Sequence, residues 1–190
     1  AGLFVLAAIL AVSFALDAPL TEQANPGMSP NPTKAPWFFM GIQEILMHFH
    51  PVFAALVIPA CLLAALLAVP YIRYDAPATG VWFQSVRGRR TTLLAATGGF
   101  VLTGGAVLLS EWVLTADNPA PLTLVRNGLV PFLAVMAVAG GFYLLVRKGL
   151  GANRSESVQA LFTLLLTSFL TLTLIGIAFR GAGMQLVWAW

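Results

Sequence analysis

The chain has 190 residues, of which 59% are hydrophobic and 9% charged, and its mean hydropathy is +0.88. A soluble domain carries about a quarter charged residues, so this composition excludes a soluble globule and indicates a membrane protein. The formal net charge is +3, but the basic residues cluster between apolar stretches, which is typical of membrane topology signals and argues against nucleic-acid binding. The single Cys61 lies in an apolar stretch, so we predict no disulfide framework and no metal site in this chain.

Five apolar stretches predict transmembrane helices, because a helix rises about 1.5 Å per residue and needs roughly 20 residues to cross the hydrocarbon core. They lie at 1–16, 51–72, 91–114, 127–146 and 157–179. The first is short, and we interpret it as a truncated span rather than as part of a secretion signal. Because the stretches are continuous and do not alternate with period two, we predict an all-α integral membrane fold.

The basic residues are distributed unevenly between the two predicted sides of the membrane. One side receives Arg73, Arg87, Arg89, Arg90, Arg147, Lys148 and Arg154, and the other receives Lys34, Arg126 and Arg180. The positive-inside rule makes the first side cytoplasmic, so loop 17–50 and the C-terminus are expected on the outer side of a bacterial inner membrane. Glu111 and Arg126, at the ends of spans, are interpreted as interface anchors, and the arginines at 87–90 as topology signals that contact anionic lipid.

Small and hydroxyl residues indicate where the spans approach one another. Ala95 and Gly99 are four residues apart, as are Ala137 and Gly141, and this spacing favours close helix contacts in lipid. A hydroxyl stripe on the last span is expected to bond to its own helix carbonyls or to a neighbouring helix rather than to line a polar path. It consists of Thr163, Thr167 and Thr171.

Segment 17–50 is the most irregular part of the sequence. Prolines at 19, 26, 30, 32 and 36 predict an outer loop without a helix. After Pro36 the spacing becomes helical and predicts an amphipathic helix at the membrane interface. Its apolar face comprises Phe38, Ile42, Ile45, Leu46 and Phe49, and a second stripe comprises Trp37, Gly41, Glu44 and His48.

Glu44 and His48 are the candidate catalytic residues of this helix. A partly desolvated carboxyl group can accept a proton near neutral pH, and an adjacent imidazole can relay it. The alternative is that Glu44 points to water and that His48 and His50 bond to solvent or headgroups. His48 and His50 do not share a helix face, so joint metal ligation is not expected.

At this segment the chain resembles the C-terminal half of cytochrome b, most closely the split, subunit IV form of cytochrome bc and b6f complexes. The resemblance rests on several short motifs and their order along the chain. These are Ala18-Pro19-Leu20, Ala24-Asn25-Pro26, Lys34-Ala35-Pro36-Trp37-Phe38-Phe39, Gly41-Ile42-Gln43-Glu44 and Val69-Pro70-Tyr71. The tail Phe179-Arg180-Gly181-Ala182-Gly183, followed by Leu186-Val187-Trp188, is similar to that of bacterial menaquinol-oxidising complexes.

The resemblance covers 1–148 as a cytochrome b C-terminal-like domain, with the last span and an aromatic tail added in 149–190. It implies an outer quinol-oxidation site shared with a haem-b-bearing N-terminal-half subunit, with no haem ligated by this chain. The substrate would be menaquinol or ubiquinol, and Pro36, Trp37, Phe38, Gly41 and Glu44 would contact it. Further implied partners are Rieske-type iron-sulfur and cytochrome c subunits, in a dimeric complex within membrane lipid.

One departure bears directly on this implied site. The family signature reads Pro-Glu-Trp-Tyr, whereas this chain reads Ala35-Pro36-Trp37-Phe38, so the usual proton-accepting carboxylate is replaced. We expect Glu44, about two helical turns further on, to act as proton acceptor with His48 as its relay. The alternative is a structural subunit that anchors a haem-bearing partner and whose quinol site is inactive. An independent transporter is a weaker interpretation, because the long spans carry no charge near their centres.

Overall fold

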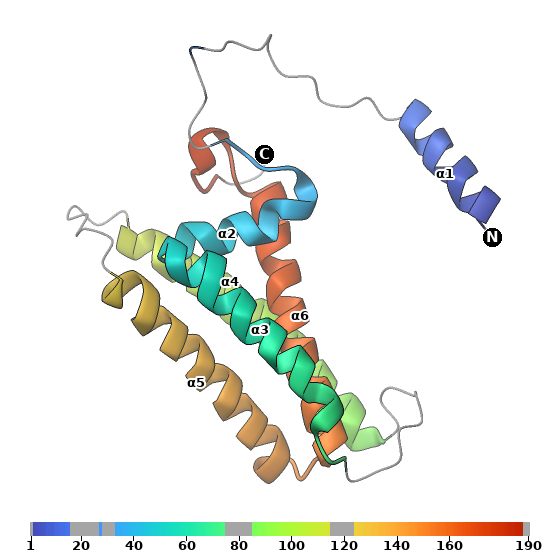
Figure 1. Ribbon diagram of the computed structural model, residues 1–190, viewed down its shortest axis with the longest axis vertical. Coiled ribbons are helices and arrows are strands. Elements are labelled where there is room, and N and C mark those ends of the chain that lie inside the picture. Colours follow the sequence, from blue (N-terminus) through green and yellow to red (C-terminus); the bar gives the residue numbers. More distant parts are fainter. Residues whose placement is uncertain (1, 16–26, 28–32, 75–84, 115–123, 188–190) are drawn as a thin grey trace. The chain divides into compact units, whose positions relative to one another are not determined.

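The computed structural model describes residues 2–15, 27, 33–74, 85–114 and 124–187. Most of these residues lie in helices (Figure 1). The chain divides into two units, Ala1–Asn31 and Pro32–Trp190. Most of the predicted Pro-rich loop, residues 17–26 and 28–32, lies outside the described residues. Within them, the isolated β-bridge found is the antiparallel pair Arg180 and Leu186.

The first unit contains helix α1 (Gly2–Ala15), an apolar helix of 14 residues. At about 1.5 Å per residue, a helix of this length extends about 21 Å, less than the roughly 30 Å of a hydrocarbon core. The span expected at 1–16 therefore corresponds to a helix that is short for a crossing, and the count of five spans stays a prediction.

The second unit contains four helices that are long and apolar enough to cross a membrane, Phe53–Tyr71, Val86–Glu111, Val125–Gly149 and Arg154–Ala178. This confirms the prediction of an all-α, multi-pass membrane protein. Their regular parts are α3 (Ile58–Ala68), α4 (Val86–Leu114), α5 (Val130–Leu144) and α6 (Arg154–Ala178). Wider turns at Phe53–Val57, Val125–Leu129 and Leu145–Gly149 and a tight turn at Val69–Tyr71 extend α3 and α5.

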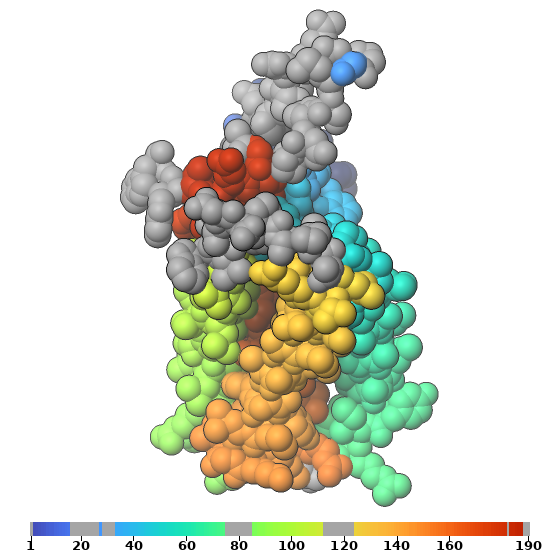
Figure 2. Space-filling model, turned by 90° about the vertical axis from the view of Figure 1, so that its left-hand side faces the viewer, coloured from blue at the N-terminus to red at the C-terminus, as the bar shows by residue number. Residues whose placement is uncertain are grey.

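A shorter helix and two tight turns complete this unit. Helix α2 (Met40–His48) follows one 3₁₀ turn at Trp37–Phe39 and lies across the end of α6, and a turn at Ala182–Met184 follows α6 (Figure 1). In the space-filling view, α5 faces the viewer, with α4 seen at its left and α3 at its right (Figure 2). No residue of α3 or α5 within these bounds is buried, and most of their apolar side chains are exposed.

Helix α6 begins earlier than the apolar stretch predicts, because its first turn is polar and capped. The Asn153 side chain accepts a hydrogen bond from Glu156 N at 2.8 Å, and Glu156 Oε2 accepts one from Asn153 N at 3.0 Å. This reciprocal capping box satisfies amide groups that a helix start leaves without partners. Helix α4 likewise begins at Val86 rather than at 91, because long arginine side chains at a helix end can extend toward water.

Helices α4 and α6 form the main helix contact, and it uses the small residues that the sequence singled out. Ala95 is fully buried, and a Cβ atom on Gly99 would collide with the Thr167 side chain and lie 2.7 Å from the carbonyl oxygen of Leu164. The prediction of close approach is thus confirmed for Ala95 and Gly99. It is wrong for Gly141 within this chain, since a Cβ atom there would meet no atom within 4 Å.

The threonine stripe of α6 bonds to its own helix, as predicted. The Thr163, Thr167 and Thr171 hydroxyls donate to the carbonyl oxygens four residues earlier, at 2.8, 2.8 and 2.7 Å. These bonds satisfy the hydroxyl groups where water is absent, so the stripe packs against α4 without requiring a polar path.

Together with their adjoining turns, α3 and α5 form continuous helical segments that we call the α3 rod (Phe53–Tyr71) and the α5 rod (Val125–Gly149). The two rods contact each other near their first residues. Pro131 has no amide hydrogen, so the Asn127 carbonyl lacks its usual helical donor, and it accepts a hydrogen bond from His50 N at 2.7 Å. A Cβ atom on Gly128 would lie 2.7 Å from Phe53 Cε2, so glycine is needed for the Phe53 ring to pack there. The proline and the glycine together create the contact between the two rods.

We expect Gly99→Leu to lower the melting temperature of the purified chain, because the added side chain would force α4 and α6 apart. Gly104→Leu is the matched control on the same helix, where a Cβ atom meets nothing within 4 Å in this chain. Thermal unfolding in detergent, followed by tryptophan fluorescence, measures both. An equal fall in melting temperature for the two variants would contradict the close contact between α4 and α6 at Gly99.

Candidate functional site

Helix α2 crosses the last turns of α6 at close range because both helices carry a glycine at the crossing. A Cβ atom on Gly41 would lie 2.5 Å from Thr173 Oγ1, and one on Gly176 would lie 2.9 Å from Met40 Cε. Met40 and Glu44 are fully buried in this contact. The crossing therefore brings the Glu44 carboxylate to the end of α6.

Arg180, two residues past the end of α6, forms a bidentate ion pair with this carboxylate. Arg180 Nε donates to Glu44 Oε1 at 2.8 Å, and Nη2 donates to Oε2 at 2.8 Å. Both side chains have no exposed surface. Parallel N–H groups match the geometry of a carboxylate, so this pair is both directional and strong.

The remaining terminal nitrogen of Arg180 binds two further oxygen atoms. Nη1 lies 2.6 Å from Glu111 Oε1, at the end of α4, and donates to the Met184 carbonyl oxygen at 3.0 Å. Met184 has a positive φ of 58°, which is uncommon for a residue with a side chain and costs of order 1–3 kcal/mol. The turn at Ala182–Met184 thus directs the Met184 carbonyl oxygen toward Arg180 and buries the Met184 side chain.

His48 completes what we call the Arg180 cluster: Glu44, His48, Ser110, Glu111 and Arg180. The Ser110 hydroxyl donates to the Val107 carbonyl at 2.9 Å, so its oxygen is the acceptor for His48 Nδ1, also at 2.9 Å. We therefore assign the proton of the neutral ring to Nδ1. His48 Nε2 then lies 3.3 Å from both Arg180 Nη2 and Glu44 Oε2.

This position allows two hydrogen-bonding states of the imidazole. Neutral Nε2 can accept a hydrogen bond from Arg180 Nη2, and protonated Nε2 can donate one to Glu44 Oε2. The first state engages the Arg180 guanidinium, and the second places a positive charge beside the Glu44 carboxylate. The ring can therefore take up a proton at Nε2 without losing its contact to Ser110.

The charges of the cluster set the protonation of its buried members. Burial alone would raise the pKa of Glu44, but the contact with His48 and the hydrogen bonds and charge of Arg180 together lower it below the ordinary value of 4.5. Burial would likewise lower the pKa of Arg180, but bonds to Glu44 and Glu111 raise it. Glu44 is therefore held as a carboxylate and Arg180 as a guanidinium.

The segment before α2 is tied to the same end of α6. Lys34 Nζ donates to the carbonyl oxygens of Ile177 and Arg180 at 2.8 and 3.0 Å, where a cation satisfies the end of a helix. The Gln43 side chain accepts from Ala35 N and donates to the Thr33 carbonyl, both at 2.8 Å. These bonds hold residues 33–35 beside the cluster.

The structure brings together only part of the predicted site. Gly41, Glu44 and His48 lie on one side of α2, toward α6 and Arg180, as their spacing predicts. Pro36 and Phe38 are exposed, and Trp37, at 70% exposure, lies in the preceding 3₁₀ turn with its ring edge-on to Phe38. The aromatic residues thus form an exposed edge outside the Arg180 cluster.

Sequence reasoning missed the ion pair, because Arg180 and Glu44 are 136 positions apart. It also missed Ser110 and assigned Glu111 to membrane anchoring. One signal was present: a carboxylate buried in an apolar chain needs a cation, and the predicted outer side held only Lys34, Arg126 and Arg180.

Comparison of the chain with protein-family models, with curated proteins and with solved structures gave no match.

We expect Arg180→Met to be strongly destabilising, by roughly 3–5 kcal/mol, because it leaves the Glu44 carboxylate buried without a cation. The double variant Glu44→Gln/Arg180→Met removes both charges and should lose less stability than Arg180→Met alone. Thermal unfolding of the purified proteins compares them. A double variant no more stable than Arg180→Met alone would contradict the claim that buried Glu44 needs Arg180 as its cation.

The low pKa of Glu44 gives the stability a predictable pH dependence. A carboxyl group whose pKa is lower in the folded state stabilises the fold above its ordinary pKa of 4.5, and this stabilisation is lost as the pH falls further. Melting temperatures measured from about pH 6 to about pH 3.5 should fall more steeply for the original chain than for Glu44→Gln. Parallel pH profiles would exclude Glu44 as the titrating group.

Proposed function

We propose that this chain is a membrane subunit of a quinol-oxidising, cytochrome bc-type electron-transfer complex of the bacterial inner membrane. In this proposal, it forms part of an outer quinol-oxidation site together with a haem-b-bearing N-terminal-half subunit. Rieske-type iron-sulfur and cytochrome c subunits of a dimeric complex would take the electrons onward. The proposal rests on the family resemblance, and the observation that carries it is the Arg180 cluster beside the exposed aromatic edge.

The cluster has the chemistry that a quinol site requires of this chain. Oxidation of a quinol to a quinone releases two electrons and two protons, so the site needs a proton acceptor outside bulk water. His48 Nε2 can accept one proton and then donate a hydrogen bond to Glu44 Oε2, 3.3 Å away. Because Arg180 holds Glu44 ionised, we assign proton uptake by the Glu44 and His48 pair to the imidazole ring of His48. The Glu44 carboxylate would then stabilise the positive charge of the protonated ring.

The remaining predicted residues fit binding rather than proton transfer. The Trp37 and Phe38 rings, 5.7 Å apart and nearly perpendicular, offer an apolar wall for a quinone ring. Both His48 nitrogens are engaged within this chain, which suits a proton carrier better than a haem ligand. As the family resemblance implies, haem b would be held by the partner subunit, where it would accept an electron.

A structural role is the second candidate function, and one specific observation favours it. The Glu44 carboxylate is fully buried, and each oxygen accepts from Arg180. A pair with this geometry can fasten α2 to α6 without taking part in proton transfer. In that case the chain would anchor a haem-bearing partner, and its quinol site would be inactive.

His48→Gln in the intact complex distinguishes the two candidates. If His48 accepts a proton, quinol oxidation should fall by roughly 100-fold while haem content and subunit composition stay the same. His50→Gln is the matched control, because the His50 ring lies apart from the cluster and contacts Val52 N at 3.3 Å. Unchanged turnover in His48→Gln would refute the catalytic role and leave the anchoring role.

A further inference from the structure

The opposite end of the second unit gathers most of the basic residues of the chain. The segments around the start of α4, the end of α5 and the start of α6 carry Arg87, Arg89, Arg90, Arg147, Lys148 and Arg154. Arg154 Nη1 donates to the Arg73 carbonyl at 2.9 Å, so the end of the α3 rod meets this region too. We call this region the basic end.

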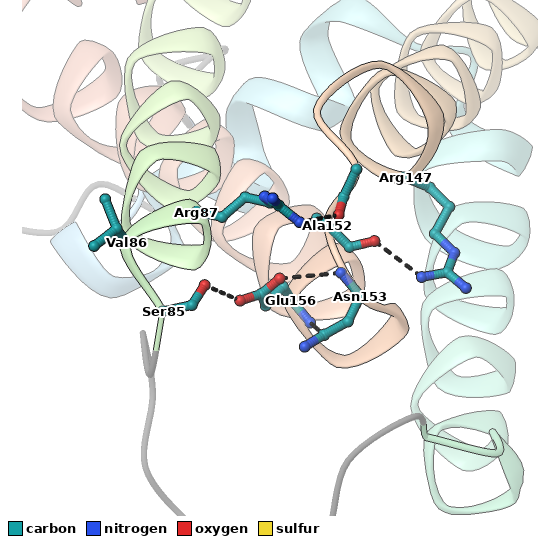
Figure 3. Close-up of a pocket in the computed structure, with 8 residues that line it drawn as sticks. Ser85, Val86, Arg87, Arg147, Ala152, Asn153 and Glu156 are labelled. Carbon is teal, nitrogen blue, oxygen red and sulfur yellow. Dashed lines mark hydrogen bonds between the residues drawn. The ribbon is translucent and has the colours of Figure 1, made fainter.

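A polar hollow of about 630 Å³ lies at the basic end, between the starts of α4 and α6 and the end of the α5 rod (Figure 3). Arg87 and Arg147 reach from opposite sides toward the segment at 151–152 (Figure 3). Arg87 Nη1 donates to the Gly151 carbonyl at 2.8 Å, and Arg147 Nη1 donates to the Ala152 carbonyl at 2.9 Å. The bond to Gly151 uses one of the five guanidinium donors of Arg87 and fixes the positive charge of this side chain at the wall of the hollow.

Among the described residues that line this hollow, Glu156 supplies the one carboxylate, and it is bound within the protein. Glu156 accepts hydrogen bonds from Ser85 Oγ and from Asn153 N, the latter at 3.0 Å, and is largely buried. Its oxygens are thus engaged by the helix cap and by Ser85, and Arg87 lines the same hollow with further N–H donors. The hollow therefore favours an anion.

An apolar hollow of about 370 Å³ adjoins the polar one along α4. The two share Val86 and Arg87, and the apolar hollow is further lined by Arg90, Thr91, Leu94 and Leu150. Both hollows lie where the apolar spans begin or end, at Val86, Gly149 and Arg154, which is the depth of lipid headgroups. A ligand occupying both hollows would be amphipathic, with an anionic head and a hydrocarbon chain.

We propose that the two hollows form a binding site for one anionic phospholipid. Its phosphate would lie beside Arg87, which lines both hollows, with Arg90 in the wall of the apolar one, and the start of an acyl chain would lie against Leu94 and Leu150. The phosphate is the shared chemistry of a lipid headgroup and of free phosphate, and the apolar hollow favours the lipid. The site does not depend on the proposed quinol chemistry, because it lies at the other end of the spans.

Native mass spectrometry of the purified chain tests this site. We expect the original chain to retain one phosphatidylglycerol under conditions that remove phosphatidylcholine, and Arg87→Gln to reduce that retention about fivefold. Arg126→Gln is the matched control, since it removes one positive charge at the other end of the spans and should retain the lipid. Leu94→Ser, which alters only the apolar hollow, should also weaken retention.

Two results would overturn the proposal. Equal retention of phosphatidylglycerol by the original chain, Arg87→Gln and Leu94→Ser would show that the lipid binds elsewhere. Displacement of the lipid by millimolar inorganic phosphate, with no effect of Leu94→Ser, would show a phosphate site that does not recognise a lipid.

Discussion

The buried ion pair between Arg180 and Glu44 is the interaction on which this end of the protein depends. Taking two charges out of water is costly, and their attraction compensates only when the geometry is good and the remaining polar atoms are bonded. The local structure meets these conditions: glycines at 41 and 176 allow α2 to approach α6, and Met184 adopts a left-handed conformation that offers its carbonyl. Glu111 and His48 bind the outer atoms of the pair.

The distribution of exposed and buried side chains around α2 suits apolar surroundings. Its apolar residues Ile42 and Leu46 are exposed, while Gly41 and Glu44 are buried. This arrangement is the reverse of a water-soluble helix and is expected where the surroundings are lipid or the apolar surface of another subunit, since the polar groups must then be satisfied within the protein. The largely unburied α3 and α5 rods agree with a chain that works within a membrane assembly.

The two ends of the spans differ in their electrostatic character. One end places a single guanidinium between two carboxylates and an imidazole, with polar hydrogens that can shift between hydrogen-bonding states. The other end places Arg87, Arg90 and Arg147 around two hollows. Within the described residues of the second unit, hydrogen bonds join Arg154 to Arg73 and Arg87 to Gly151 at one end, and Lys34 to Arg180 at the other. We therefore propose different tasks for the two ends, proton transfer or anchoring at one and anion binding at the other.

The sequence by itself determined what depends on spacing within one helix. Apolar length predicted four long helices, periodicity placed Gly41, Glu44 and His48 on one side of α2, and short spacings predicted the Ala95 and Gly99 contact and the threonine bonds. Only the tertiary structure decided which cation meets Glu44, that Ser110 orients His48, and that Glu111 joins the pair instead of acting only as an anchor. These contacts join α2, α4 and the turn after α6, and helical periodicity carries no information about which helices cross or at what height.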